Sequence, residues 1–277
     1  MNKRIALIVI TLITLHFGLK ASVPDRPVAG SGAALGLTGI SINSTWATLQ
    51  NQAALAWQNN YWVGIHHENR YLVKELGLSA IAGIIPTSTG TFGVNLSHFG
   101  YSQFNVTRAC MAYGMKFSDK FSAGVGLNLH HLQIAGDYEN KNAYTVEGGL
   151  MYMPTSKLTL GAYVFNPTRS SFDEQQSMPP LLGLGISYFP SEKVMLALQI
   201  DDNTETKPAI RGGVEYSPIK NIAVRLGYSS ENPQGLTGGF GWSIKQIQVD
   251  LSFGYHNVLG YTPQLSVSYC FAKQKVN

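Results

Sequence analysis

The chain has 277 residues and a formal net charge of +4, and 13% of its residues are charged, against about 25% in ordinary soluble domains. Three positive charges, Lys3, Arg4 and Lys20, lie at the extreme N-terminus, so the +4 falls by three to about +1 for the remainder. This balance gives no argument for nucleic-acid binding. Apolar and polar residues interleave along the chain, which argues against a soluble globule with one large apolar core.

The N-terminus predicts an export signal. Lys3 and Arg4 precede an apolar run over residues 5–19, and Ala21 is a small residue suited to cleavage. The run is shorter than the roughly 20 residues that a membrane-spanning helix needs. We therefore expect residues 1–21 to be a signal peptide for the Sec pathway, with an uncleaved anchor as the alternative.

Residues 22–59 differ from the rest of the chain and predict a short plug without a core of its own. Residues 43–56 have a helical pattern, and Ser44 or Thr45 is suited to cap its first turn. Trp46 would lie on the apolar face of this helix.

Residues 60–272 repeat a two-residue rhythm. In residues 246–255, for example, Leu251 and Phe253 would lie on one face of a strand and Asp250 on the other. Fourteen such patterns are centred on 61–67, 76–85, 91–99, 104–116, 121–133, 143–153, 157–165, 181–189, 193–201, 207–216, 221–229, 235–244, 246–256 and 262–271.

The connections between these patterns alternate in length. Tight turns rich in Pro, Gly and Ser alternate with longer polar links, as in bacterial barrels with short periplasmic turns and longer outer loops. The sequence therefore predicts an all-β fold, a 14-stranded antiparallel transmembrane β-barrel of the outer-membrane type with a short helical plug. An even number of strands leaves both chain ends in the periplasm, where residues 273–277 would form a tail.

The rhythm also assigns the two faces of the barrel. Apolar side chains of strands 157–165, 221–229 and 262–271 should face lipid, and aromatic residues near strand ends should form interfacial girdles. The aromatic candidates are Tyr61, Phe99, Tyr113, Tyr152, Tyr188, Phe189, Tyr216, Tyr255 and Tyr269. A charge facing lipid at mid-depth costs roughly 2–4 kcal/mol, so charged residues within strands should face the lumen. They are Arg108, Glu147, Arg211, Glu215, Arg225 and Asp250.

No motif anchors catalysis, a cofactor or a metal. The pairs His66-His67 and His130-His131 would point to opposite faces of a strand, so neither pair would converge on one ion. The two cysteines fall in the fourth and fourteenth strand patterns, which are not neighbours, so a disulfide is not expected. Gly-Xaa-Gly runs inside strands lack the context of a phosphate loop and are better suited to relieve crowding in the lumen.

Three segments resemble one family. Residues 44–56 resemble the N-terminal segment of FadL-type barrels, with Gln52 where that motif has proline. Residues 165–169 and 256–263 are similar to a mid-barrel motif and a closing hairpin of the PorV/PorQ branch. The resemblance implies a fourteen-stranded barrel whose N-terminal segment plugs the lumen, with hydrophobic cargo in FadL-type members and type IX secretion in PorV/PorQ-type members.

Three functions remain as hypotheses, all without enzymatic activity and all in the cell outer membrane of a Gram-negative bacterium. The first is a PorV/PorQ-type accessory to protein secretion or surface attachment. The second is a FadL-like passive channel for small hydrophobic compounds, in which glycine-rich strands could kink to open a lateral exit. The third is a structural scaffold for an envelope partner. Expected partners are membrane lipid and either secretion-system components or hydrophobic small molecules, and Trp46 and Asn51 are the candidate plug or gating residues.

Overall fold

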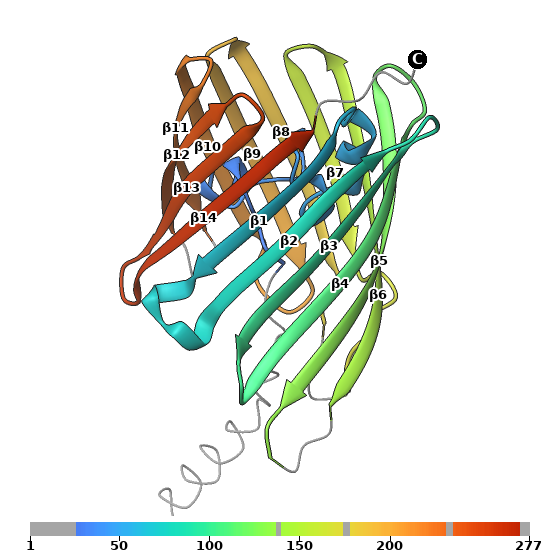
Figure 1. Ribbon diagram of the computed structural model, residues 1–277, viewed down its shortest axis with the longest axis vertical. Coiled ribbons are helices and arrows are strands. Elements are labelled where there is room, and N and C mark those ends of the chain that lie inside the picture. The colour runs from blue at the N-terminus through green and yellow to red at the C-terminus, as the bar shows by residue number, and fades with distance from the viewer. Residues whose placement is uncertain (1–25, 137–139, 174–177, 231–234, 272–277) are drawn as a thin grey trace, which may run out of the picture.

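The computed structural model describes residues 26–136, 140–173, 178–230 and 235–271 (Figure 1). The predicted signal peptide and C-terminal tail lie outside these residues. The described residues contain fourteen strands in one closed antiparallel barrel, each paired with its neighbours in sequence. The strands are β1 Tyr61–Asn69, β2 Gly77–Pro86, β3 Thr91–Tyr101, β4 Phe104–Lys116, β5 Phe121–Ile134, β6 Lys141–Thr155, β7 Leu158–Phe165, β8 Leu181–Ser191, β9 Val194–Asn203, β10 Ala209–Ile219, β11 Ile222–Ser229, β12 Leu236–Ile244, β13 Ile247–His256 and β14 Gly260–Phe271.

The barrel closes between its first and last strands. β1 pairs with β14 from Tyr61 opposite Phe271 to Glu68 opposite Gln264. This closure leaves no free sheet edge, and in a bilayer every backbone amide must find its partner within the protein. The predicted fold class, a 14-stranded antiparallel transmembrane barrel, is confirmed.

Side chains alternate between lipid and lumen as the sequence predicted. Leu160, Leu226 and Leu265 are exposed on the outside, whereas Tyr163 and Gln264, which have the opposite parity, are buried inside. A continuous coat of large exposed apolar side chains is the outer surface that a membrane barrel needs.

Most of the predicted girdle aromatics are exposed near strand ends, but Phe99 and Phe189 are not. Phe189 is half-buried and packs inside the barrel against a cluster that includes Leu35 and Met195, so its predicted girdle position was wrong. Tyr61, Tyr152 and Tyr188 are more than two-fifths exposed, whereas Phe99 is only 9% exposed. Phe99 shares the parity of Ser97, which faces the lumen, so the prediction of a girdle position was wrong.

The two ends of the barrel differ. Tight turns lie at the upper end in Figure 1, here called the turn end, and most of the longer links lie at the opposite end, here called the loop end. The link between β3 and β4, residues 102–103, is a tight turn at the loop end. Three hairpins at the turn end contain Pro154, Pro190 or Pro218, and the strand register shifts at each. Proline cannot donate a ladder hydrogen bond, so it is tolerated where the ladder is already interrupted.

Residues 26–58, here called the luminal segment, run inside the barrel (Figure 1). The segment contains the short helix α2 Ser31–Ala34 and the 3₁₀ helices η1 Ala47–Leu49 and η2 Gln52–Trp57, while η3 Arg70–Leu72 and η4 Lys74–Leu76 lie in the β1–β2 link. Among the described residues, no helix is long and apolar enough to cross a membrane.

The single helix predicted over residues 43–56 was wrong. The chain breaks between η1 and η2 at Asn51, whose backbone is extended and whose side chain accepts a hydrogen bond from the Ala53 amide. The predicted cap Ser44 instead accepts from the amide of Trp46 in a local turn. Hydrogen bonds from Asn51 to the barrel wall override the helical pattern, as tertiary contacts often do.

The lipid-facing coat yields a stability prediction. Leu251 lies near the middle of β13 and faces outward, so Leu251→Arg should lower the free energy of unfolding in bilayers by about 2–4 kcal/mol. Val258→Arg, in the exposed β13–β14 link, should change it by less than about 0.5 kcal/mol. Reversible urea unfolding of the protein in lipid vesicles measures both, and equal effects would contradict the assigned faces.

Candidate functional site

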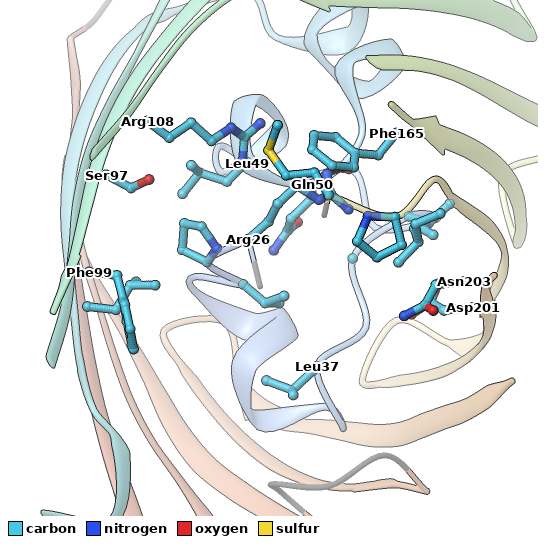
Figure 2. A pocket seen from close by; sticks show the side chains of 18 of the residues that line it. Arg26, Leu37, Leu49, Gln50, Ser97, Phe99, Arg108, Phe165, Asp201 and Asn203 are labelled. Atoms are coloured by element: carbon cyan, nitrogen blue, oxygen red, sulfur yellow. Dashed lines mark hydrogen bonds between the residues drawn. The ribbon is translucent and has the colours of Figure 1, made fainter. Parts of the chain in front are cut away.

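A cavity of about 120 Å³ lies inside the barrel, on the loop side of the luminal segment (Figure 2). Its walls include residues at the loop ends of several strands, among them Phe99 of β3, Phe165 of β7 and Leu181 of β8. Leu49 and Gln50 of the luminal segment also line it. The cavity therefore lies where the luminal segment blocks the barrel from within.

The lining of this cavity is mostly apolar, with a few charged groups. The apolar lining residues include Pro27, Val28, Leu37, Ile40, Leu49, Leu78, Phe99, Val106, Phe165, Met178 and Leu181. Arg26, Arg108 and Arg211 add positive charge, and Asp201 is the one carboxylate among the described lining residues. Small-molecule sites commonly combine such an apolar lining with a few polar groups that fix orientation.

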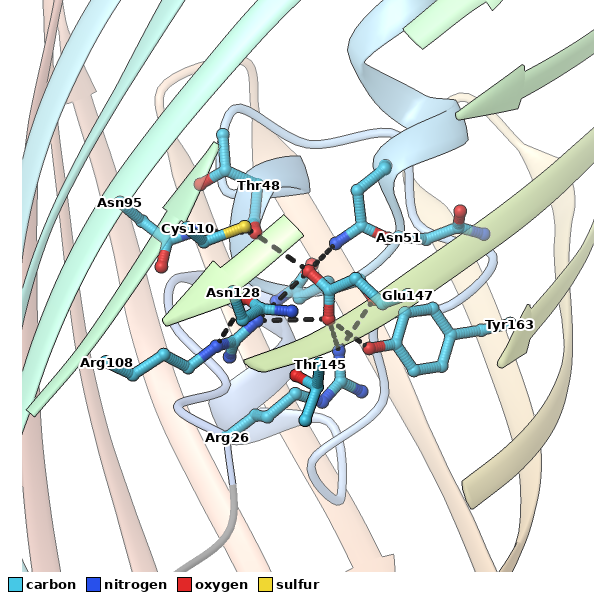
Figure 3. A network of polar contacts seen from close by, with 12 residues as sticks. Arg26, Thr48, Asn51, Asn95, Arg108, Cys110, Asn128, Thr145, Glu147 and Tyr163 are labelled. Atoms are coloured by element: carbon cyan, nitrogen blue, oxygen red, sulfur yellow. Dashed lines mark hydrogen bonds and ion pairs between the residues drawn. The ribbon is translucent and has the colours of Figure 1, made fainter. Parts of the chain in front are cut away.

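Arg108 and Glu147 form the centre of a buried polar cluster beside the cavity (Figure 3). Arg108 Nη2 donates to both carboxylate oxygens of Glu147 at 3.0 Å, and Arg108 Nε donates to Asn128 Oδ1 at 2.8 Å. The Tyr163 hydroxyl donates to Glu147 Oε2 at 2.5 Å, and Arg26 Nη1 lies 3.7 Å from the same oxygen. The carboxylate is thus paired and hydrogen-bonded from several strands, as a buried charge requires.

Gln52 joins the luminal segment to this cluster. Its Nε2 donates to Glu147 Oε1 at 2.6 Å, and both side chains are buried. The residue that departs from the FadL-type motif, glutamine in place of proline, therefore makes a contact that proline cannot make. The Cys110 thiol also points at Glu147, 3.5 Å from Oε1, and Cys110 and Cys270 are free thiols on β4 and β14.

The remaining predicted charges form two further groups. Arg225 bonds Glu215 and Asp250, each at 2.6 Å. Separately, Arg211 lies 3.1 Å from Asp201, and its Nη1 donates to the Leu37 carbonyl at 3.1 Å. The structure thus places Arg108 with Glu147, and Arg225 with Glu215 and Asp250, while Arg211 pairs with a residue that the sequence had not singled out.

Trp46 and Asn51 hold the luminal segment against the wall. The Trp46 ring packs edge-to-face on Trp62 of β1, with centroids 4.7 Å apart. Asn51 Nδ2 donates to the Ile40 carbonyl at 2.7 Å and to the Leu150 carbonyl of β6 at 3.2 Å. A Cβ at Gly149 would lie 1.8 Å from Asn51 Oδ1, so this wall position must be glycine for the contact to form.

Several cavity residues were missed by sequence reasoning. Phe99 could have been found from its parity, and Leu49 from its place in the plug pattern. Arg26, Gln50 and Asp201 carry no motif, and only the closed barrel brings them together. The predicted separation of the histidine pairs is observed, since His66 is buried and His67 exposed. Within the ranges that the structure describes, no three His, Cys, Asp or Glu side chains gather as metal ligands.

No protein-family model and no curated protein sequence matches the chain. Solved structures do match. The toluene transporter TbuX of Ralstonia pickettii has a TM-score of 0.63 at 13% identity, over 92% of this chain and 100% of that chain. The toluene transporter TodX of Pseudomonas putida has a TM-score of 0.64 at 14% identity, over 90% and 99%. A FadL homologue of Pseudomonas aeruginosa has a TM-score of 0.64 at 11% identity, over 90% and 99%.

The chain shares the fold of these three proteins. At such low identity the similarity establishes the fold alone. None of the three structures is described as a secretion component.

The Glu147 cluster predicts a large single-mutant effect. Glu147→Leu should lower the free energy of unfolding by about 3–5 kcal/mol, because it leaves the Arg108 guanidinium buried without its partner. Glu147→Leu combined with Arg108→Leu should recover part of that loss, since no unpaired charge remains. Equilibrium unfolding in vesicles tests both, and a double variant no more stable than the single variant would contradict the pairing.

Asn51 predicts a local effect on the luminal segment. Asn51→Ala should speed hydrogen exchange of residues 40–57, because the segment loses its hydrogen bonds to the wall and the cap on η2. The matched control is Asn43→Ala, since Asn43 is exposed and bonds only Gln58 in the same segment among the described residues. Exchange measured by mass spectrometry should be unchanged in the control, and equal exchange in both variants would exclude an anchoring role.

Proposed function

We propose that the protein is a non-enzymatic outer-membrane channel for small hydrophobic molecules, which bind in the cavity between the luminal segment and the loop end. The observation that carries this proposal is the apolar cavity inside a barrel with the fold of toluene transporters. A dry apolar cavity of about 150 Å³ binds benzene, so a cavity of about 120 Å³ is of the right order for one small apolar molecule.

One residue in the wall of the cavity carries a buried donor without a partner. Arg108 Nη1 has no hydrogen-bond partner among the described residues, although Arg108 lines the cavity. Buried donors without partners are rare, and we infer that Arg108 turns this donor toward the cavity to bond an acceptor group of a bound molecule. The favoured ligand is therefore a small hydrophobic molecule that carries one acceptor.

Passage requires the luminal segment to move. Residues of this segment from 46 to 56 are almost completely buried against the wall, so the lumen is filled on the turn side of the cavity. We infer that ligand binding and displacement of the segment are coupled.

The secretion hypothesis has no comparable support. Its two motifs have structural roles here: Asn166, at φ 49°, donates to the carbonyls of Ser170 and Met178 and organises the β7–β8 link. His256 Nδ1 accepts from the amides of Val258 and Leu259 in the β13–β14 link. Packing thus accounts for these residues without a cargo protein.

Filling the cavity tests the channel. Val106 faces inward on β4 and lines the cavity, so Val106→Trp should occupy it and reduce uptake of toluene by proteoliposomes toward the rate of empty liposomes. Val214→Trp makes the same change on the lipid face of β10 and should leave uptake at the wild-type rate. Wild-type uptake equal to that of empty liposomes would refute the proposed function.

A further inference from the structure

Six consecutive strands carry a polar side chain at one register on the outside of the barrel. The strand pairing places His67 of β1 opposite Ser79 of β2, and Ser79 opposite His98 of β3. The same row continues across β4, β5 and β6. Its members are His67, Ser79, His98, Thr107, His131 and Asn142.

Each histidine of this row is bonded to the next strand through the same ring nitrogen. Nδ1 of His67 lies 2.9 Å from Ser79 Oγ, and Nδ1 of His98 lies 3.0 Å from Thr107 Oγ1. Nδ1 of His131 lies 2.8 Å from Asn142 Oδ1. When a serine or threonine hydroxyl donates to Nδ1, the opposite ring nitrogen Nε2 carries the proton and can donate it to another group.

The first two histidines border a hollow of about 380 Å³ on the lipid-facing surface of β14, β1, β2 and β3. Its apolar walls are formed by Ile65, Ile81, Leu96 and Leu265. Ser79 lies at its centre in the strand pairing, and the next outward residue of β2 toward the loop end is Gly77. The hollow, here called the groove, thus has the small side chain of Ser79 at its centre and an imidazole on either side.

The groove lies in the loop-end halves of β1, β2 and β3. Tyr101, exposed at the loop end of β3, lies three residues beyond His98, and such tyrosines mark the membrane interface. On the other side of His67, the same register continues through Leu265, Leu251 and Phe240, which are exposed and apolar. The polar row is therefore a local feature of β1–β6 and not a general rim of the barrel.

We propose that this groove binds a phosphate-bearing lipid of the surrounding membrane, with its acyl chain against the apolar walls and its phosphate between His67 and His98. The backbones of these histidines lie on alternate strands, about 9.5 Å apart, and each side chain can turn toward the other across Ser79. A phosphate that accepts one hydrogen bond from each imidazole through separate oxygens spans roughly 8 Å between the two nitrogens. A polar group at the edge of hydrocarbon is costly without a partner, and this lipid supplies one to each ring.

Native mass spectrometry of the protein in dodecyl maltoside micelles, which contain no phosphate, tests the proposal with three probes. Dioleoyl phosphatidic acid should be retained as one molecule per barrel. Dioleoylglycerol has the same chains without phosphate and should bind at least about ten-fold more weakly, the loss expected when a charge-assisted hydrogen bond is removed. Glycerol 3-phosphate, with the phosphate but no chains, should not be retained.

Variants locate the site. His67→Leu with His98→Leu should weaken phosphatidic acid retention by about ten-fold or more. His131→Leu removes a histidine of the same row outside the groove and should leave retention within about two-fold, a change well below one hydrogen bond. Ser79→Leu fills the groove with both histidines in place and should abolish retention of the chains.

The proposal is overturned if dioleoylglycerol is retained as well as phosphatidic acid, or if the His67 and His98 double variant retains phosphatidic acid normally. Equal losses in the double variant and in His131→Leu would also overturn it, since binding would then be nonspecific along the row. Each variant is first checked for an unchanged thermal unfolding midpoint, and if the double variant fails to fold, Ser79→Leu and His131→Leu decide the question.

Discussion

The hydrogen bonds between β1 and β14 are the constraint on which the rest of the molecule depends. A bilayer offers no water to backbone amides, so an open sheet of this composition would leave two unpaired edges in hydrocarbon. Pairing from Tyr61 to Glu68 with Phe271 to Gln264 removes both edges. Once the ring is closed, the two-residue alternation has a fixed meaning: one parity meets lipid and the other meets the lumen. The exposed Leu251 and the buried Asp250 are neighbours in sequence and lie in different environments for this reason.

Closure of the barrel creates a lumen that must be filled by side chains or by water. Here the luminal segment fills much of it, and the wall accommodates that segment through positions without side chains. A Cβ at Gly124 would lie 2.4 Å from the Gln52 backbone, just as one at Gly149 would meet Asn51. The inward-facing charges are paired with each other, Glu147 with Arg108 and Asp250 with Arg225. They therefore belong to the packed interior around the luminal segment and do not line an open pore. The glycine-rich strands that suggested a lateral kink are thus explained by close contact with the segment.

The two-residue periodicity of the sequence predicts which face of a strand each residue occupies. It does not predict structure that is decided by contacts between distant parts of the chain. The strands, their faces and their order were readable because alternation is a property of each strand by itself, as at Leu265 and Gln264. The helix expected over residues 43–56 failed because Asn51 bonds the wall, and no local pattern encodes that partner. The partners of Glu147 come from Gln52, Arg108 and Tyr163, which are far apart in sequence and meet only after closure. The cavity was not predictable for the same reason, although the parity of Phe99 already placed that residue inside.

The inner cavity and the outer groove lie back to back across β3. Ser97 lines both, with Phe99 on the inner side and His98 on the outer side. The ladder here is unbroken, since β3 pairs with β2 and β4 through this region without a register shift. A molecule moving directly from cavity to lipid would therefore have to break several backbone hydrogen bonds in a medium that offers no replacement. Displacing the luminal segment costs side-chain contacts and leaves the ladder intact, so movement of the segment is the physically cheaper way to open a path out of the cavity.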